Sequence, residues 1–201
     1  MSNPALETIK AVQRCVQSDF RQEKSGESYA LVDENSGQNL EIAVGGLSDS
    51  VCLVIDKKRA KTKDGAPSKD PTLPFIEPSE PGLTSKVDAI LIVSRDDVLY
   101  VFLLEMKTGN AGNYLLQMQT GKLITEFLFG LLKLHKKCDT PVPQFFGVLC
   151  YGGERKTVPK GTTRHGSAIE FEERQDLKVC DWSQPILNAK DFVNAAKRCV
   201  L

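Results

Sequence analysis

The chain has 201 residues, which is long enough for one domain with a sizeable core, whereas two domains would each be small. Its 26 Lys and Arg residues are balanced by 26 Asp and Glu residues, so the net charge is zero. This balance excludes a protein that coats nucleic acid through bulk charge alone, and any binding of polyanions must come from a local patch.

Cysteine spacing and hydropathy exclude further classes. The six cysteines form no CxxC pair and only two histidines are present, so a structural zinc site is not expected. The N-terminal stretch lacks the apolar core of a signal peptide, and the longest apolar runs are shorter than a membrane span. We therefore expect a cytoplasmic protein with reduced thiols and no membrane partner.

The first quarter of the chain predicts a helix followed by short strands. Apolar residues at intervals of three and four predict a helix from residue 4 to about residue 23, with Asn3 as its N-cap. Two β-prone stretches at 28–32 and 40–44 flank a turn-like Asn-Ser-Gly. Residues 51–56 form a short apolar run that is typical of a buried strand.

Residues 57–86 form a long proline-rich loop that begins with a basic cluster, including Lys57, Lys58 and Arg59. Loops of this length are usually functional or mobile. Because the segment ends just before Asp88, it is a candidate lid or substrate-contacting segment. A solvated surface insertion is the alternative, with at least equal weight.

A β-hairpin and a long helix are predicted next. Residues 87–93 and 99–106 are the two most convincing strands, and the segment 94–97 between them is a turn signal. The helix should run from about residue 114 to 136. Its apolar side is expected to contain Leu115, Met118, Leu123, Phe127, Leu131 and Leu134.

The remainder predicts a buried strand at 145–151, a glycine-rich basic loop at 152–166, two strand-like pieces at 168–172 and 177–179, and a final helix at 189–199. This order of helices and strands predicts a mixed α/β fold, organised as a single domain over residues 1–201.

Glu105 and Lys107 end the second hairpin strand, and they lie on one side of it because residues i and i+2 share a face. A buried carboxylate is costly unless it is paired or bound to metal. If a two-residue turn is centred on Asp96 and Asp97, opposed residue numbers sum to 193 and Asp88 faces Glu105 at roughly 5 Å between Cβ atoms. A sum of 192 puts the two acids on opposite faces, and the sequence leaves both registers open.

Two carboxylates at that distance can share one Mg²⁺ or Mn²⁺ ion, since both ions prefer oxygen ligands. A metal held by Asp88 and Glu105 would neutralise phosphodiester charge and lower the pKa of bound water. Lys107 could orient the attacking water or stabilise the extra charge on the phosphoryl group. These residue types predict a metal-dependent phosphodiesterase.

The run KVDAILIV, a turn and LYVFLLEMKTG together resemble the PD-(D/E)xK nuclease superfamily over about residues 51–151. The resemblance implies a restriction-endonuclease-like core, a central mixed β-sheet flanked by helices. It assigns the catalytic roles to Asp88, Glu105 and Lys107 and adds the Met106 carbonyl as a metal ligand. Val87 stands where the family has its proline. The resemblance further implies an endonuclease that cuts DNA in preference to RNA, acts as a homodimer, and serves in roles such as restriction or phage defence.

Family members also have a further acid from an early helix, for which Glu7 and Glu41 are candidates, and we prefer Glu41. Some members place a glutamine on the helix after the ExK triplet. Gln117 and Gln119 are the candidates here, and exposed helix residues are the alternative reading.

A second basic cluster lies in the loop 152–166 and could neutralise substrate phosphates. Its residues are Arg155, Lys156, Lys160 and Arg164. Taken singly, such clusters are more often solvated loops. The rival function is a catalytically inactive module of the nuclease fold that binds nucleic acid or a protein partner. A serine β-lactamase is excluded, although Lys107 begins a Lys-Thr-Gly, because the chain has no Ser-x-x-Lys.

Overall fold

The computed structural model describes residues 3–33, 38–47, 49–55, 82–83, 85–107, 112–151 and 169–200. Within these ranges the chain has two mixed β-sheets and three α-helices, which confirms the predicted mixed α/β class. Most of the two predicted basic loops lies outside the described residues. No helix in the described ranges is long and apolar enough to cross a membrane.

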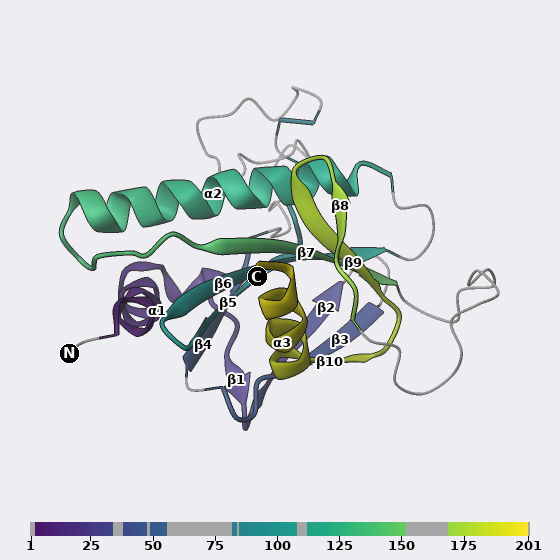
Figure 1. Ribbon diagram of the computed structural model, residues 1–201, viewed down its shortest axis with the longest axis horizontal. Coiled ribbons are helices and arrows are strands. Elements are labelled where there is room, and N and C mark those ends of the chain that lie inside the picture. The colour runs from purple at the N-terminus through teal and green to yellow at the C-terminus, as the bar shows by residue number, and fades with distance from the viewer. Residues whose placement is uncertain are drawn as a thin grey trace, which may run out of the picture.

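The larger sheet has the strand order β4-β5-β6-β7-β9-β8 (Figure 1). Its strands are β4 (Asp49–Val54), β5 (Ala89–Arg95), β6 (Val98–Lys107), β7 (Gln144–Tyr151), β8 (Glu172–Arg174) and β9 (Leu177–Trp182). The strands β6, β7 and β9 are parallel, whereas the pairs β4–β5, β5–β6 and β8–β9 are antiparallel. The carboxyl ends of three neighbouring strands therefore meet at one edge of the sheet.

The β5–β6 hairpin has the register that puts the two acids opposite each other. Ala89 pairs with Leu104 and Ile90 with Leu103, so opposed residue numbers sum to 193, which is the one of the two open registers that the proposed carboxylate pair requires. The turn residues Asp96 and Asp97 have φ angles of 51° and 62°. Two consecutive left-handed residues are typical of a type I′ turn, which is tolerated by aspartate and matches the twist of the flanking strands.

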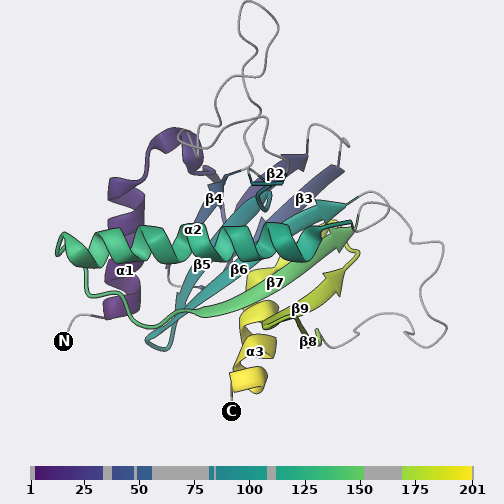
Figure 2. The same ribbon diagram turned by 90° about the horizontal axis from the view of Figure 1, so that it is seen from above.

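The larger sheet is covered on both faces (Figures 1 and 2). Two helices, α1 (Pro4–Cys15) and α2 (Tyr114–Leu134), cover one face, where Val101 and Leu103 of β6 join their core. The other face packs against α3 (Ala189–Val200) and a smaller sheet of order β1-β2-β3-β10. The strands of that smaller sheet are β1 (Lys24–Ser25), β2 (Ser28–Asp33), β3 (Gln38–Ala43) and β10 (Ile186–Asn188).

The orientation of α2 differs from the prediction. Its buried residues are Met118, Gly121, Thr125, Phe129 and Leu132. Of the six residues expected on the buried side, only Met118 is buried, while Leu123, Phe127, Leu131 and Leu134 are exposed and Leu115 is half-buried. The helix has apolar residues almost all round, so periodicity alone could not identify the side that meets the sheet.

Other predicted boundaries also change. The first helix ends at Cys15, where Val16 has extended backbone angles, and a short 3-10 turn at Ser18–Phe20 follows. The strand expected at 168–172 begins at Glu172 instead, and β1 and β10 were not predicted. Both are very short, with two and three residues, and local pattern gives little signal for strands of that length.

Candidate active site

Asp88 and Glu105 are brought together at the start of β5 and near the end of β6. Asp88 directly precedes Ala89, which pairs with Leu104, so the hairpin register places Asp88 opposite Glu105. The Met106 N–H donates a hydrogen bond of 2.6 Å to Asp88 Oδ2. This bond fixes the Asp88 carboxylate at the end of the neighbouring strand. The Met106 side chain points into the core on the opposite face, so only its backbone takes part in the site.

Glu105 is a buried carboxylate that is only partly satisfied. Its side chain is 1% exposed, and Lys107 Nζ lies 2.6 Å from its Oε1. Its Oε2 atom is buried without a hydrogen-bond partner. Burial raises the pKa of Glu105 from 4.5 to about 8, and the neighbouring Asp88 charge adds to the rise while Lys107 opposes it. The site therefore contains an oxygen that lacks the stabilisation its burial requires.

Lys107 and Gln117 extend the site onto α2. Besides its contact with Glu105, Lys107 Nζ donates a 2.9 Å hydrogen bond to Gln117 Oε1. Gln117 Nε2 in turn donates to the backbone carbonyl of Lys86, at 3.1 Å. Because both ends of its amide are bonded, Gln117 is held in one orientation, and it aims Lys107 at Glu105.

Close packing of α2 on the sheet places Gln117 over Lys107. Gly121 lies one helical turn after Gln117, and a Cβ atom at Gly121 would lie 2.5 Å from Val87 Cγ1 and 3.3 Å from Leu103 Cδ2. A Cβ at Gly147 of β7 would likewise lie 2.6 Å from Met118 Sδ. Glycine at these two positions lets the helix approach the sheet, and that approach brings the Gln117 amide within reach of the end of β6.

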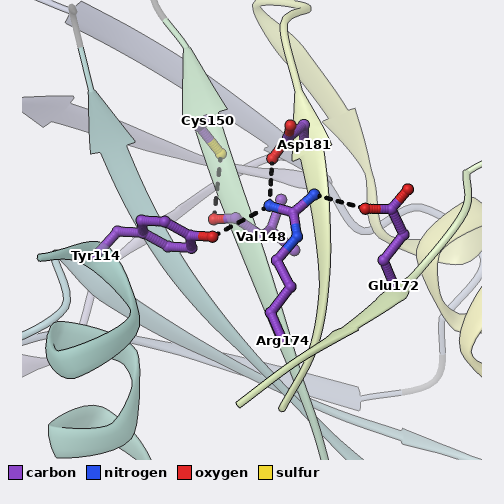
Figure 3. A network of polar contacts seen from close by, with 6 residues as sticks. All are labelled: Tyr114, Val148, Cys150, Glu172, Arg174 and Asp181. Atoms are coloured by element: carbon purple, nitrogen blue, oxygen red, sulfur yellow. Dashed lines mark hydrogen bonds and ion pairs between the residues drawn. The ribbon is translucent and has the colours of Figure 1, made fainter. Parts of the chain in front are cut away.

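A second polar network holds the first turn of α2 (Figure 3). Arg174 of β8 donates to the Tyr114 hydroxyl at 3.3 Å and to Asp181 at 2.9 Å, and it contacts Glu172 at 3.0 Å. Burial lowers the pKa of Arg174, but the bonds to Asp181, Tyr114 and Glu172 outweigh it and raise the pKa overall. Arg174 therefore stays charged and joins the β8–β9 hairpin to the start of α2.

The two networks share one face of the larger sheet. Glu105 pairs with Leu149, and Leu149 pairs with Asp181, so Glu105 and Asp181 lie in one row two strands apart. At about 4.8 Å per strand this separates them by roughly 10 Å. Charged groups therefore occur in a row at the edge where β6, β7 and β9 end.

Gln119 is not part of the carboxylate site. Its Nε2 donates to the backbone carbonyl of Gln175 in the β8–β9 turn, at 3.3 Å. Gln117 and Gln119 are two residues apart, which is about 200° around a helix, so only one of them can face the end of β6.

Neither candidate for the further acid reaches the pair. Glu41 is exposed on β3 of the smaller sheet, and its neighbours Leu40 and Ile42 face the core between the two sheets. Alternation along the strand therefore turns Glu41 away from the larger sheet, whose opposite face carries Glu105. Glu7 is exposed on α1 and forms a 3.0 Å ion pair with Lys10. The preference for Glu41 as a metal ligand is not supported by this geometry.

The predicted nucleic-acid-binding residues lie outside the described residues. They are Lys57, Lys58, Arg59, Arg155, Lys156, Lys160 and Arg164.

Several residues that shape the site were missed in the sequence. Gly121 could have been found, because a glycine in the middle of a long predicted helix often has a packing reason such as close approach of the backbone. The Lys86 carbonyl, Tyr114 and Arg174 gave no local signal, because their roles come from contacts between distant segments.

The residues present fit a divalent cation. Asp88 and Glu105 supply carboxylate oxygens, which Mg²⁺ and Mn²⁺ prefer, and the unpartnered Oε2 of Glu105 is the atom that most needs a positive neighbour. In the described part of the chain, no group of three or more His, Cys, Asp and Glu side chains forms a metal cluster. A cation bound here would thus have two carboxylate ligands among these residues, together with water or substrate oxygens.

Comparison of the chain with protein-family models, with curated proteins and with solved structures gave no match.

Proposed function

We propose that this chain is a metal-dependent nuclease with a restriction-endonuclease-like core, hydrolysing phosphodiester bonds with Mg²⁺ or Mn²⁺. The observation that carries the proposal is the position of Asp88 opposite a buried Glu105 whose Oε2 has no hydrogen-bond partner. Such an oxygen destabilises the folded chain unless a cation or a proton joins it. The resemblance to the PD-(D/E)xK superfamily points to the same two residues.

Each residue of the site has a defined task. Asp88 and Glu105 would hold the cation, which when bound neutralises phosphate charge and makes water more acidic. Lys107, aimed by Gln117, supplies a positive charge beside Glu105 at the place where a phosphate oxygen would gain charge in the transition state. The Met106 N–H keeps Asp88 turned toward its neighbour strand. The Met106 carbonyl is a further ligand by resemblance only.

The substrate class rests on two supports. A cation between two carboxylates beside a lysine suits a phosphodiester, which is an anionic and slow-reacting group. DNA in preference to RNA, an endonuclease mode of cutting and a homodimer follow from the resemblance.

Cleavage assays with matched variants test the proposal. Supercoiled DNA, linear DNA and RNA are each incubated with the full chain in Mg²⁺, Mn²⁺ or chelator. We expect metal-dependent cleavage that is lost in Glu105→Gln and Lys107→Met and kept in Glu41→Gln, an exposed carboxylate outside the site. Cleavage that survives Glu105→Gln would refute the assignment of the site.

A non-catalytic binding module is the second candidate. It is favoured by the contacts that Lys107 already makes, since an intrastrand ion pair with Glu105 and a bond to Gln117 also serve as structural links. Thermal unfolding with Mn²⁺ separates the two functions. If the site is a nuclease site, Mn²⁺ raises the unfolding temperature of wild type but not that of Glu105→Gln. If Glu105 and Lys107 form only a structural ion pair, Mn²⁺ leaves the unfolding temperature of both proteins unchanged.

A further inference from the structure

The outer side of α2, which faces away from the larger sheet, carries a patch of apolar side chains. They are Leu116, Leu123, Phe127, Leu131 and Leu134, and they are between 38% and 73% exposed. The side that packs on the sheet carries Met118, Thr125 and Leu132 instead. Single exposed apolar residues are ordinary, but five along one helix form a contiguous patch of the kind that marks an interaction surface.

The patch has the spacing of a helix-pairing seam. Positions 116, 120, 123, 127, 130 and 134 alternate intervals of four and three residues, as the contact positions of a coiled coil do. In the same heptads the sheet-facing positions 118, 125 and 132 lie on the opposite side. One side of α2 is therefore used by the sheet, and the other presents a seam that fits a second helix.

We propose that this seam pairs with the same seam of a second copy of the chain, with the two α2 helices antiparallel. The seam is symmetric under reversal about position 125, so Leu116 would face Leu134 of the second copy and Leu123 would face Phe127. Thr120 would face Gly130, which has no side chain to hold the backbones apart and where the described part of this chain places nothing within 4 Å of an added Cβ atom. A two-fold contact requires this property, because residue i must meet j while j meets i.

Charge also favours the antiparallel arrangement. Lys133, Lys136 and Lys137 are exposed at the carboxyl end of α2 and just beyond it. A parallel pair would bring both basic ends together, whereas an antiparallel pair separates them by the length of a 21-residue helix, about 30 Å. The like-charge contact that the antiparallel pair creates is Glu126 beside its own copy, close to the two-fold axis.

The surface available is adequate for a dimer. With on the order of 150–200 Å² for a fully exposed large side chain, covering the five residues on both copies removes roughly 1,000 Å² of apolar surface from water. A standard interface buries about 1,600 Å² in total. Flanking side chains such as Gln119 and Ile124 add to the contact, so we expect a dissociation constant on the order of micromolar. This inference does not depend on the proposed nuclease activity.

Sedimentation of the full chain from about 1 to 100 µM, a range around that dissociation constant, tests the pairing. Wild type is expected to shift from monomer to dimer over this range. Phe127→Glu should remain monomeric with unchanged circular dichroism, because the Phe127 side chain is 68% exposed. Val142→Glu, at an exposed apolar residue outside α2, is the matched control and should dimerise like wild type. A wild-type chain that stays monomeric at 100 µM would overturn the proposal.

Disulfide trapping tests the direction of the pair, in a background with the more accessible cysteines Cys15, Cys138 and Cys199 changed to serine. A mixture of Leu116→Cys and Leu134→Cys chains should cross-link, and neither should cross-link alone. Cross-linking of Leu116→Cys with itself would refute the antiparallel arrangement.

Two further variants test the seam itself. Glu126→Gln should tighten the dimer several-fold, because it removes the like-charge contact near the two-fold axis. A monomeric chain in which Leu123→Cys resists thiol labelling would show that residues of the same chain cover the seam, and it would overturn the proposal.

Discussion

The change Glu105→Gln is expected to stabilise the metal-free chain as the pH rises. Glutamine keeps the shape of the side chain and removes a charge that is buried at 1% exposure. Burial raises the pKa of Glu105 from 4.5 to about 8, with a further contribution from Asp88. The Glu105 carboxyl of the folded wild type therefore titrates near pH 8, whereas a glutamine side chain has no proton to lose.

The direction of the effect follows from proton linkage. In the unfolded chain the carboxyl loses its proton near pH 4.5, whereas in the folded chain it keeps the proton until about pH 8. Between these values the folded state binds more protons, so its stability falls as the pH rises. The contribution of Glu105 protonation to the free energy of unfolding is fully present below pH 4.5 and is lost as the pH rises to about 8. At 1.36 kcal/mol for each pKa unit, the loss at pH 7 is on the order of 3 kcal/mol.

Urea unfolding of wild type and Glu105→Gln in chelator, at several pH values from 5 to 8, measures this loss. The stability of the variant relative to wild type should grow by about 3 kcal/mol across the range. This corresponds to roughly 6–12 °C in the midpoint of thermal unfolding for a domain of this size. Glu41→Gln, at an exposed carboxylate, should track wild type. If the wild-type and Glu105→Gln curves run parallel over the whole range, the reasoning about the buried charge is wrong.

Three further changes probe the site and the packing of α2 on the sheet, and a fourth, at Gly130, is their control. Lys107→Met should lower the single-turnover cleavage rate by about 10²–10³-fold while keeping the rise in unfolding temperature with Mn²⁺, and loss of that rise would place Lys107 in metal binding instead. Asp88→Asn should lower the pKa of Glu105, because it removes the neighbouring negative charge, and the loss of stability with rising pH should therefore occur at lower pH in this variant than in wild type. Gly121→Ala should cost about 1–3 kcal/mol because its Cβ would lie 2.5 Å from Val87 Cγ1. Gly130→Ala, with open space around its Cβ, should instead stabilise the helix by up to about 1 kcal/mol, and equal effects at the two glycines would refute the packing argument.

The hairpin of the candidate site could be predicted because its signals are local. The two aspartates of the turn and the Glu-x-Lys spacing indicate the hairpin and put Glu105 and Lys107 on one face, whereas the choice between the two registers comes only from the structure, which pairs Ala89 with Leu104. None of these signals needs information from another part of the chain.

The rest depends on contacts between distant segments. Whether Gln117 or Gln119 enters the site depends on the side that α2 turns to the sheet, which the small residues Gly121 and Gly147 determine from two different elements. The pairing of β10 with β3 joins residues about 145 positions apart through three residue pairs. The apolar pattern of the sequence carries no information about such a pairing, since a three-residue strand could pair with the edge strand of either sheet.

The unpartnered oxygen of Glu105 also bears on how long the protein would survive in a cell. Proteolysis acts mainly on the fraction of molecules that is unfolded, and a ligand that binds only the folded chain reduces this fraction. A cation present at 100 times its dissociation constant would lower it about 100-fold. If the cation proposed for Asp88 and Glu105 binds only the folded chain, copies made while metal is scarce are degraded first, and the abundance of the protein follows the supply of that cation without any separate sensor.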